Sequence, residues 1–167
     1  MTLFFFMDGI KIIDNFLTRE EMGDIWKDVP GLLWRRQRSS PDEYDIDFLM
    51  SEVMDREYYN TYLYDRVVSC LDEKVKLQRV YFNGQYWGCD GSIHTDGCDI
   101  TALIYINPYN DGFGGFTEMW NGDDHYIIPP IQGRLVFFPG NWDHKAYPFS
   151  RQSIMMRMTL AYKLELC

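Results

Sequence analysis

The sequence lacks the features that mark a membrane or secreted protein. No apolar run approaches the roughly 18 to 20 residues that a membrane-spanning helix needs. The opening MTLFFFMDG lacks the basic start and the long apolar middle of a signal peptide. The four cysteines form no CxxC pair and no regular framework, so we expect reduced thiols and no structural zinc. These absences predict a cytoplasmic protein without a membrane partner.

Positive charge is also scarce. The chain carries 16 Lys and Arg against 25 Asp and Glu, which gives a formal net charge of -9. Such a chain repels a phosphate backbone unless its basic residues cluster, so nucleic acid is the least favoured partner. A peptide or protein substrate, or a small neutral or basic molecule, fits this charge better.

Apolar and aromatic residues are abundant. Hydrophobic residues make up 46% of the 167 residues, which is enough for a sizeable core, and we predict one domain over 1–167. Aromatic residues make up 17% of the chain, so flat amphipathic side chains should line the core and any pocket. The sequence contains no internal repeat and no low-complexity segment.

Helix signals lie in the first half of the chain. Residues 9–17, GIKIIDNFL, read as a strand, and residues 18–21 form a capping box for a helix that runs to about Val29. Apolar residues at near-helical spacing predict a second helix over residues 51–72. Between the two helices, the polar segment 34–47 is predicted to be a surface loop.

After Lys76 the pattern changes to short apolar or alternating runs. The runs are LQRVYF, DITALIYIN, GGFTEMW, HYIIPP, GRLVFFP and IMMRMTLAYKLEL. They are separated by segments rich in Asn, Gly, Asp and Pro, so each is predicted to be a strand. Helices followed by many closely spaced strands predict an α+β protein, mainly β, whose body is a sandwich or a barrel.

The stretch GCDGSIHTDGCD places His94 and Asp96 two residues apart. If it enters a strand, both side chains lie on one face and can reach one ion. A third ligand would be His125 or His144, and we favour His144 because it follows a buried strand and a tight turn. Two His and one carboxylate suit non-haem Fe(II), and also zinc, although the HExxH helix of zinc proteases is absent. A surface histidine without a metal is the alternative.

The last run, IMMRMTLAYKLEL, alternates between two faces. One face is apolar throughout, and the other carries Met155, Arg157, Thr159, Ala161 and Lys163. If the second face lines a barrel interior, Arg157 is a buried cation that requires an anionic partner. A bound dicarboxylate would satisfy it bidentately, with the Thr159 hydroxyl as a further donor. The alternative is a solvated face with Arg157 in water.

Several of these segments together resemble a known family. The succession YFNGQYWGCDGSIHTD, ITALIYINP, GGFTEMW, GRLVFFPGNWDH and RMTLAYKL is similar to the 2-oxoglutarate and Fe(II)-dependent dioxygenases, in particular the prolyl 4-hydroxylase-like branch. The similarity runs from about Gly9 to the C-terminus. It implies a double-stranded β-helix (jelly roll) core backed by N-terminal helices. It also implies that His94, Asp96 and His144 are the iron ligands and hence the catalytic residues.

The same resemblance implies a cosubstrate pocket. Arg157 would pair with the distal carboxylate of 2-oxoglutarate, Tyr105 in LIYINP would donate a hydrogen bond to that carboxylate, and Tyr81 matches another pocket position. More residues separate Arg157 from His144 in the sequence than separate the corresponding pair in many relatives. Arg151, in the preceding turn, therefore stays a rival for this role.

The implied activity couples oxidative decarboxylation of 2-oxoglutarate to hydroxylation of a substrate C–H bond, with ascorbate as a conceivable reductant. A peptidyl proline is the favoured substrate and a free small molecule is the alternative. Two other classes remain open: a jelly-roll module that binds a metal or ligand without turnover, and a zinc or manganese hydrolase, which would not need Arg157.

Apolar residues, most of them aromatic, are predicted around this centre. Phe137, Phe138, Trp142 and Met155 would shield it or simply pack the core. Two glycine-rich loops could cover the barrel mouth with aromatic faces. The first loop contributes Tyr86 and Trp87, and the second contributes Tyr109 and Phe113.

Overall fold

The computed structural model describes residues 4–7, 9–38 and 47–167. Its strands are β1 (Phe4–Met7), β2 (Ile10–Ile13), β3 (Arg35–Gln37), β4 (Phe48–Glu52), β5 (Val75–Gln85), β6 (Ile100–Tyr105), β7 (Thr117–Asn121), β8 (Asp124–Ile128), β9 (Leu135–Pro139), β10 (Asp143–Ala146) and β11 (Arg157–Leu166). Its helices are α1 (Arg19–Asp28) and α2 (Leu63–Val68), with a π-helical turn at Tyr58–Tyr62 and short 3-10 turns at Val29–Gly31 and Asp111–Phe113.

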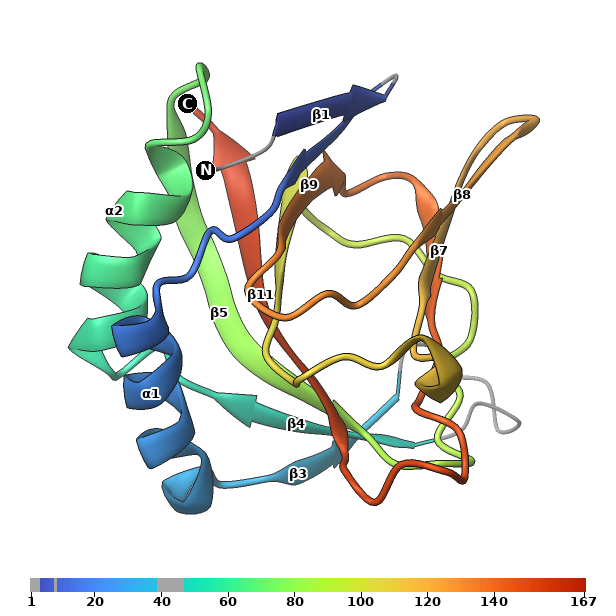
Figure 1. The fold of residues 1–167 in the computed structure, drawn as a ribbon. Coiled ribbons are helices and arrows are strands. Elements are labelled where there is room, and N and C mark those ends of the chain that lie inside the picture. Colours follow the sequence, from blue (N-terminus) through green and yellow to red (C-terminus); the bar gives the residue numbers. More distant parts are fainter. Residues whose placement is uncertain (1–3, 8, 39–46) are drawn as a thin grey trace.

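The strands form two antiparallel sheets. The larger sheet has the order β1-β2-β9-β6-β11-β5-β4-β3, and the smaller one has the order β10-β7-β8. Helices α1 and α2 lie on one side of the larger sheet, and the smaller sheet lies on the opposite side (Figure 1). This arrangement confirms the predicted mainly β protein backed by helices.

Helix α1 begins as the sequence predicts. The Thr18 hydroxyl accepts a hydrogen bond from the Glu21 backbone N–H at 3.2 Å, and the Glu21 carboxylate accepts one from the Thr18 N–H at 2.8 Å. The same carboxylate accepts from the Tyr62 hydroxyl at 2.8 Å and pairs with Arg66. The buried Glu21 therefore caps α1 and ties it to the second helical segment.

The second predicted helix begins too early. Residues Ser51 and Glu52 belong to β4, which pairs with β5 from Leu49↔Gly84 to Glu52↔Tyr81. Because β5 supplies a full row of backbone partners, pairing overrides the helical spacing of the side chains. In the predicted loop 34–47, residues 35–37 form the edge strand β3, and residues 39–46 lie outside the described part of the chain.

Both faces of the larger sheet are buried. One face packs against the helices around Ile25, Leu63 and Phe82, and the other faces the smaller sheet around Tyr105 and Met119. The six strands predicted after Lys76 all form, as β5, β6, β7, β8, β9 and β11.

Strand β11 separates the two predicted faces. Met158, Leu160, Tyr162 and Leu164 join the core beneath the helices, whereas Arg157, Thr159 and Lys163 line a cavity between the sheets. The strand starts at Arg157, so Ile154, assigned to the apolar face, is 99% exposed instead. Among the described residues, no helix is long and apolar enough to cross a membrane. All four cysteines are unpaired.

Candidate active site

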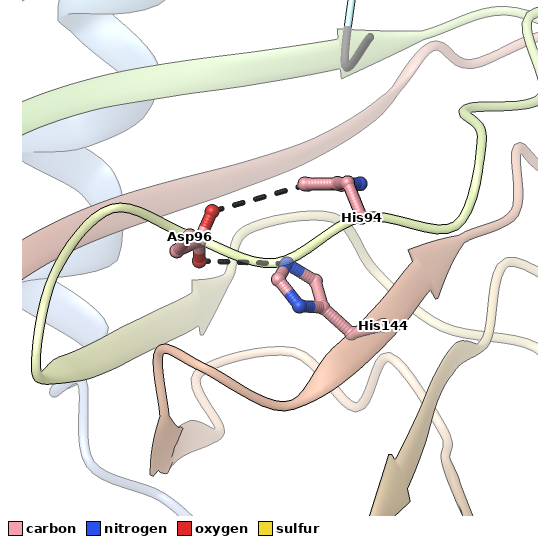
Figure 2. A group of neighbouring side chains, drawn as sticks. All are labelled: His94, Asp96 and His144. Carbon is pink, nitrogen blue, oxygen red and sulfur yellow. Dashed lines mark ion pairs between the residues drawn. The ribbon is translucent and has the colours of Figure 1, made fainter.

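Three candidate ligands converge at one edge of the smaller sheet. His94 and Asp96 come from the loop between β5 and β6, and His144 comes from β10 (Figure 2). The predicted strand around His94 is reduced to a single bridge, in which the His94 N–H donates to the His144 carbonyl at 3.1 Å and the reverse bond is 2.9 Å. The Asp96 N–H donates to the Gly140 carbonyl at 2.6 Å, which fixes the loop beside the turn that precedes β10.

The ligand atoms of this cluster face one another. One carboxylate oxygen of Asp96 lies 3.9 Å from His94 Nε2, and the other lies 3.4 Å from His144 Nε2. One potential ligand atom from each residue lies within 4.8 Å of the others. His125 is not part of the cluster, because it stacks on Trp120 in the β7–β8 hairpin.

Both imidazoles are held in the tautomer that a metal requires. His94 Nδ1 lies 3.0 Å from the Ser92 carbonyl, and His144 Nδ1 lies 3.0 Å from the Trp142 carbonyl. A carbonyl oxygen can only accept, so each Nδ1 must carry the proton. Each Nε2 therefore presents a lone pair toward Asp96, as in metal sites whose histidines are oriented by an outer hydrogen bond.

Electrostatics favour the same protonation states. Burial lowers the pKa of His144 to about 4, against the opposing effect of Asp96, so its imidazole is neutral near pH 7. Burial alone would raise the pKa of Asp96. The Lys163 charge, with hydrogen bonds from Lys163 and Thr101, lowers the pKa of Asp96 below its usual value. The cluster thus offers a neutral imidazole at His144 and one carboxylate, beside the Nε2 atom of His94.

Lys163 and Thr101 were not predicted as site residues. Lys163 pairs with Asp96 Oδ2, and the Thr101 hydroxyl donates to the same oxygen at 2.5 Å. The two residues face each other across the β11–β6 pair. The signal for Lys163 was present, since it shares the alternating face of Arg157. Thr101 could be identified only from the register between β6 and β11, which the sequence does not reveal.

Arg157 is buried and surrounded by neutral groups. Its Nε donates to the Gly115 carbonyl at 2.8 Å, Nη1 to the Gln85 side chain at 2.9 Å, and Nη2 to the Thr117 hydroxyl at 2.8 Å. Only 1% of its surface is exposed, and no acid among the described residues forms an ion pair with it. The guanidinium also interacts with the Tyr105 hydroxyl. A guanidinium can donate from both terminal nitrogens to the two oxygens of one carboxylate.

The other predicted pocket residues lie around Arg157. The Tyr105 ring centroid is 5.5 Å from the guanidinium carbon, and its hydroxyl donates to Thr117 at 2.8 Å. Thr159 and Tyr81 line the same inner cavity, of about 70 Å³, with both histidines of the cluster. Arg157 and the two histidines of the cluster therefore face one cavity.

Gln85 was also missed by the sequence analysis. Its carbonyl oxygen accepts from Arg157, while its amide nitrogen donates to the Cys89 and Ala146 carbonyls at 3.3 and 3.1 Å. A neutral amide thus contacts the buried guanidinium where a glutamate would neutralise it. Arg151 does not compete for this position, because it is exposed and its guanidinium lies over the Trp87 ring.

The predicted aromatic shield is divided between the two faces of the sheet. Phe138 lies edge-on to His144, with ring centroids 4.9 Å apart, and excludes water from that imidazole. Trp142 stacks on Tyr126, and Phe137 packs on the helix side. For Met155 the structure shows only partial burial outside the inner cavity.

The two aromatic loops differ in exposure. Tyr86 and Trp87 are 52% and 61% exposed, and the Arg151 guanidinium covers one face of the Trp87 ring. Tyr109 and Phe113 are half-buried, and the Phe113 ring lies 6.0 Å from that of Phe149. Of the two loops, the first therefore exposes more aromatic surface.

Comparison with known proteins gives the class of fold. No protein-family model matches the sequence, and no curated protein matches it. The structure nevertheless superposes on solved 2-oxoglutarate–Fe(II) oxygenases over almost its whole length. This confirms the double-stranded β-helix core that the resemblance implied.

Three of these structures illustrate the likeness. A prolyl hydroxylase from Trichoplax adhaerens, in complex with a peptide of hypoxia inducible factor, has a TM-score of 0.77 at 17% identity, over 95% of this chain and 84% of that one. A prolyl-4-hydroxylase from Pseudomonas putida has a TM-score of 0.69 at 16% identity, over 93% and 92%. HygX from Streptomyces hygroscopicus, with nickel, 2-oxoglutarate and hygromycin B bound, has a TM-score of 0.69 at 9% identity, over 94% and 82%. At such identities the likeness is one of fold.

Proposed function

We propose that this protein is a 2-oxoglutarate and Fe(II)-dependent dioxygenase that hydroxylates a substrate C–H bond. The observation that carries the proposal is a buried cation without an anion, Arg157, which lines the same cavity as the two histidines of the cluster formed with Asp96. A buried guanidinium among neutral groups is costly unless a ligand supplies the opposite charge.

The donor set fits Fe(II). His94, Asp96 and His144 would hold the metal on one side and leave its remaining positions open, as in facial-triad sites. Bound Fe(II) would supply the oxidising chemistry that 2-oxoglutarate and O2 drive. Phe138 would keep water from His144, while Lys163 and Thr101 hold Asp96 ionised and oriented.

The remaining cavity residues would bind the cosubstrate. Arg157 would take its distal carboxylate through its terminal N–H groups, with the Thr159 hydroxyl as a further donor. Tyr105 lies outside the cavity lining and donates its hydroxyl hydrogen to Thr117, so it would have to exchange that bond to donate to the carboxylate. Tyr81 forms part of the wall nearer the metal ligands, where it approaches Lys163. Ascorbate would serve only as an optional reductant.

A peptidyl proline is the proposed substrate. The Trichoplax structure contains a peptide, and the exposed Tyr86 and Trp87 could lie against one at the cavity mouth. A free small molecule is the second candidate, because HygX was solved with hygromycin B. We propose neither nucleic acid nor membrane as a partner, and we propose one domain, 1–167, in the cytoplasm, where unpaired cysteines persist.

Two non-oxygenase readings compete with this proposal. A binding module would take metal and 2-oxoglutarate without turnover, and a zinc or manganese hydrolase would have no use for the cation at Arg157. The position of Arg157 in the cavity favours the oxygenase over the hydrolase.

The deciding experiment needs no substrate. Protein loaded anaerobically with Fe(II) should bind 2-oxoglutarate, and admission of O2 should then release succinate through slow turnover without substrate. Binding without succinate would favour the module, and metal binding without 2-oxoglutarate binding would favour the hydrolase. His125→Ala provides the matched control, because it removes a histidine outside the cluster.

A further inference from the structure

A second cavity, of about 480 Å³, opens onto the ligand cluster from outside. We term it the outer groove. Its walls come from β3, β4, β5 and the loop that carries His94 and Asp96. It shares Phe48, Tyr81, His94 and Lys163 with the inner cavity. A substrate that enters from this side reaches the proposed metal site along these walls.

Cations predominate among the described residues that line the outer groove. Apart from the proposed ligand Asp96, the charged residues in this described lining are Arg38, Arg79 and Lys163. Each has an acidic partner, Asp47 for Arg38, Glu52 for Arg79 and Asp96 for Lys163, and both Asp47 and Glu52 lie outside the lining. On a chain with a net charge of -9, such a concentration of cations beside the reactive centre is a local feature.

Arg79 is the best placed of these cations. Its Nε and Nη2 pair with Glu52, and its guanidinium carbon lies 4.5 Å from the centroid of the Tyr81 ring. These contacts hold the group in one orientation, and among the described residues Nη1 has no hydrogen-bond partner. A preoriented guanidinium with free N–H groups is suited to a carboxylate.

The remaining lining suits a peptide. Gln37 and Gln78 present side-chain amides, and Phe48 and Met50 supply an apolar surface. A nucleic-acid backbone is longer than the groove, so its other phosphates would lie against the acidic surface of the protein. A single side-chain carboxylate needs only one of the three cations.

On this basis we propose that the outer groove binds an acidic segment of a peptide substrate, with a carboxylate at Arg79. The inference rests on the proposed oxygenase function, which it deepens by naming the charge of the substrate. It departs from the preference for a neutral or basic substrate that net charge alone indicates.

The experiment measures binding without turnover. Three series of fluorescently labelled peptides, each centred on proline and flanked by Glu, Gln or Lys, are titrated with the metal-free protein by fluorescence anisotropy. The Glu series should bind roughly tenfold more tightly than the Lys series, as expected for complementary charges in a groove. Arg79→Glu should reverse the order. Arg35→Glu makes the same charge change on β3 outside the groove lining and should leave the order unchanged.

Three results would overturn the inference. They are equal affinity for the three series, reversal of the order by Arg35→Glu as well, and tighter binding of a single-stranded oligothymidylate than of the Glu peptides. Arg79→Gln, which should remove the preference without reversing it, covers the case in which Arg79→Glu does not fold. Since the titration uses metal-free protein, its outcome is separate from that of the succinate assay.

Discussion

At the scale of single residues, the neighbours of a side chain separate candidates that look alike in sequence. His144 and His125 are both histidines on strands of the smaller sheet. Only His144 faces Asp96, with its Nδ1 held by a carbonyl, whereas His125 stacks on an aromatic ring and approaches Glu118.

The first prediction follows from this difference. His144→Ala should reduce Fe(II) affinity at least about a hundredfold, because one of three ligands is lost, and calorimetric titration under anaerobic conditions would measure it. His125→Ala should change the affinity by less than about twofold. Equal losses in the two variants would show that the third ligand lies elsewhere.

The second prediction concerns the buried cation. Arg157→Gln should weaken 2-oxoglutarate binding by about 2 to 5 kcal/mol, because a carboxylate loses a charge-assisted bidentate partner. Titration of the nickel-loaded protein with 2-oxoglutarate would measure the loss. Arg151→Gln, on the exposed turn, should leave the affinity unchanged. The reverse order would move the cosubstrate site into that turn.

A second variant tests the same site without removing Arg157. Gln85→Glu should place a carboxylate beside Nη1, neutralise the cation internally and weaken 2-oxoglutarate binding about tenfold or more. Gln152→Glu makes the same change on an exposed loop and should have no effect. Undiminished affinity in Gln85→Glu would contradict the role given to Arg157.

How far the sequence predicts these residues depends on what determines each position. Strand alternation placed Arg157 and Thr159 on an interior face, because period two is a local property. Lys163 lies on the same face, and its role was missed because its partner Asp96 is distant in sequence. Gln85 was missed for a related reason, since its three partners come from three separate segments.

At the scale of elements, the loop that carries Asp96 depends on a close approach to the turn after β9. The Gly140 N–H donates to the Asp99 carbonyl at 2.9 Å, and its carbonyl accepts from Asp96. A Cβ on Gly140 would lie 2.2 Å from the Cys98 carbonyl oxygen, which no real side chain tolerates.

The third prediction is that Gly140→Ala displaces this loop. The variant should lose Fe(II) affinity and about 1 to 3 kcal/mol of unfolding free energy, because backbone atoms would have to shift. Chemical denaturation and metal titration would measure the two losses. Gly97→Ala is the matched control in the same loop, since a Cβ there meets nothing within 4 Å. Similar losses in Gly97→Ala would show that the close packing at Gly140 is not the cause.

The fourth prediction concerns the junction of α1 with the second helical segment. Hydrogen bonds from Thr18, Arg66 and Tyr62 outweigh burial and lower the pKa of Glu21. The carboxylate therefore stabilises the fold above its unfolded pKa, and this contribution is lost as pH falls through the lower folded pKa. Glu21→Gln should cost about 1 to 3 kcal/mol at pH 7, and less in acid.

Urea denaturation of Glu21→Gln at pH 7 and in acid would test this pH dependence. Glu20→Gln, in the same turn but exposed, should change stability by less than about 0.5 kcal/mol. A loss in Glu21→Gln that stays constant with pH would mean that shape rather than charge matters at this site.

Element boundaries were predictable where local signals decide them. The capping box fixed the start of α1, and alternating runs found six of the strands. The short strands β1, β3, β4 and β10 were missed because they exist through their pairing partners, such as β4 beside β5 and β10 beside β7.

At the scale of the whole molecule, two buried clusters share one sheet. One lies beneath the helices and the other between the sheets, and β11 contributes to both. Because neither cluster is complete without this strand, the fifth prediction is a single cooperative thermal transition. Nickel and 2-oxoglutarate at about 100 times their dissociation constants should together raise the Tm by roughly 10 to 20 °C. Two separate transitions would argue against one domain over 1–167.

The net charge of the whole chain is a poor predictor of the charge of its substrate. The net charge of -9 is an average, and it does not indicate that Arg38, Arg79 and Lys163 gather at one groove. That grouping depends on the pairing of β3, β4, β5 and β11, which composition does not determine. Substrate class is therefore the property that the sequence predicts least.

The backbone bridge between His94 and His144 also sets an order of events in folding. The two residues are separated by the whole of β6 to β9, so the entropic cost of closing their contact is lower once those strands have paired. A chain without this bridge would offer three separated candidate ligands, which would hold a metal ion poorly. We therefore expect a metal ion to bind after the chain has folded.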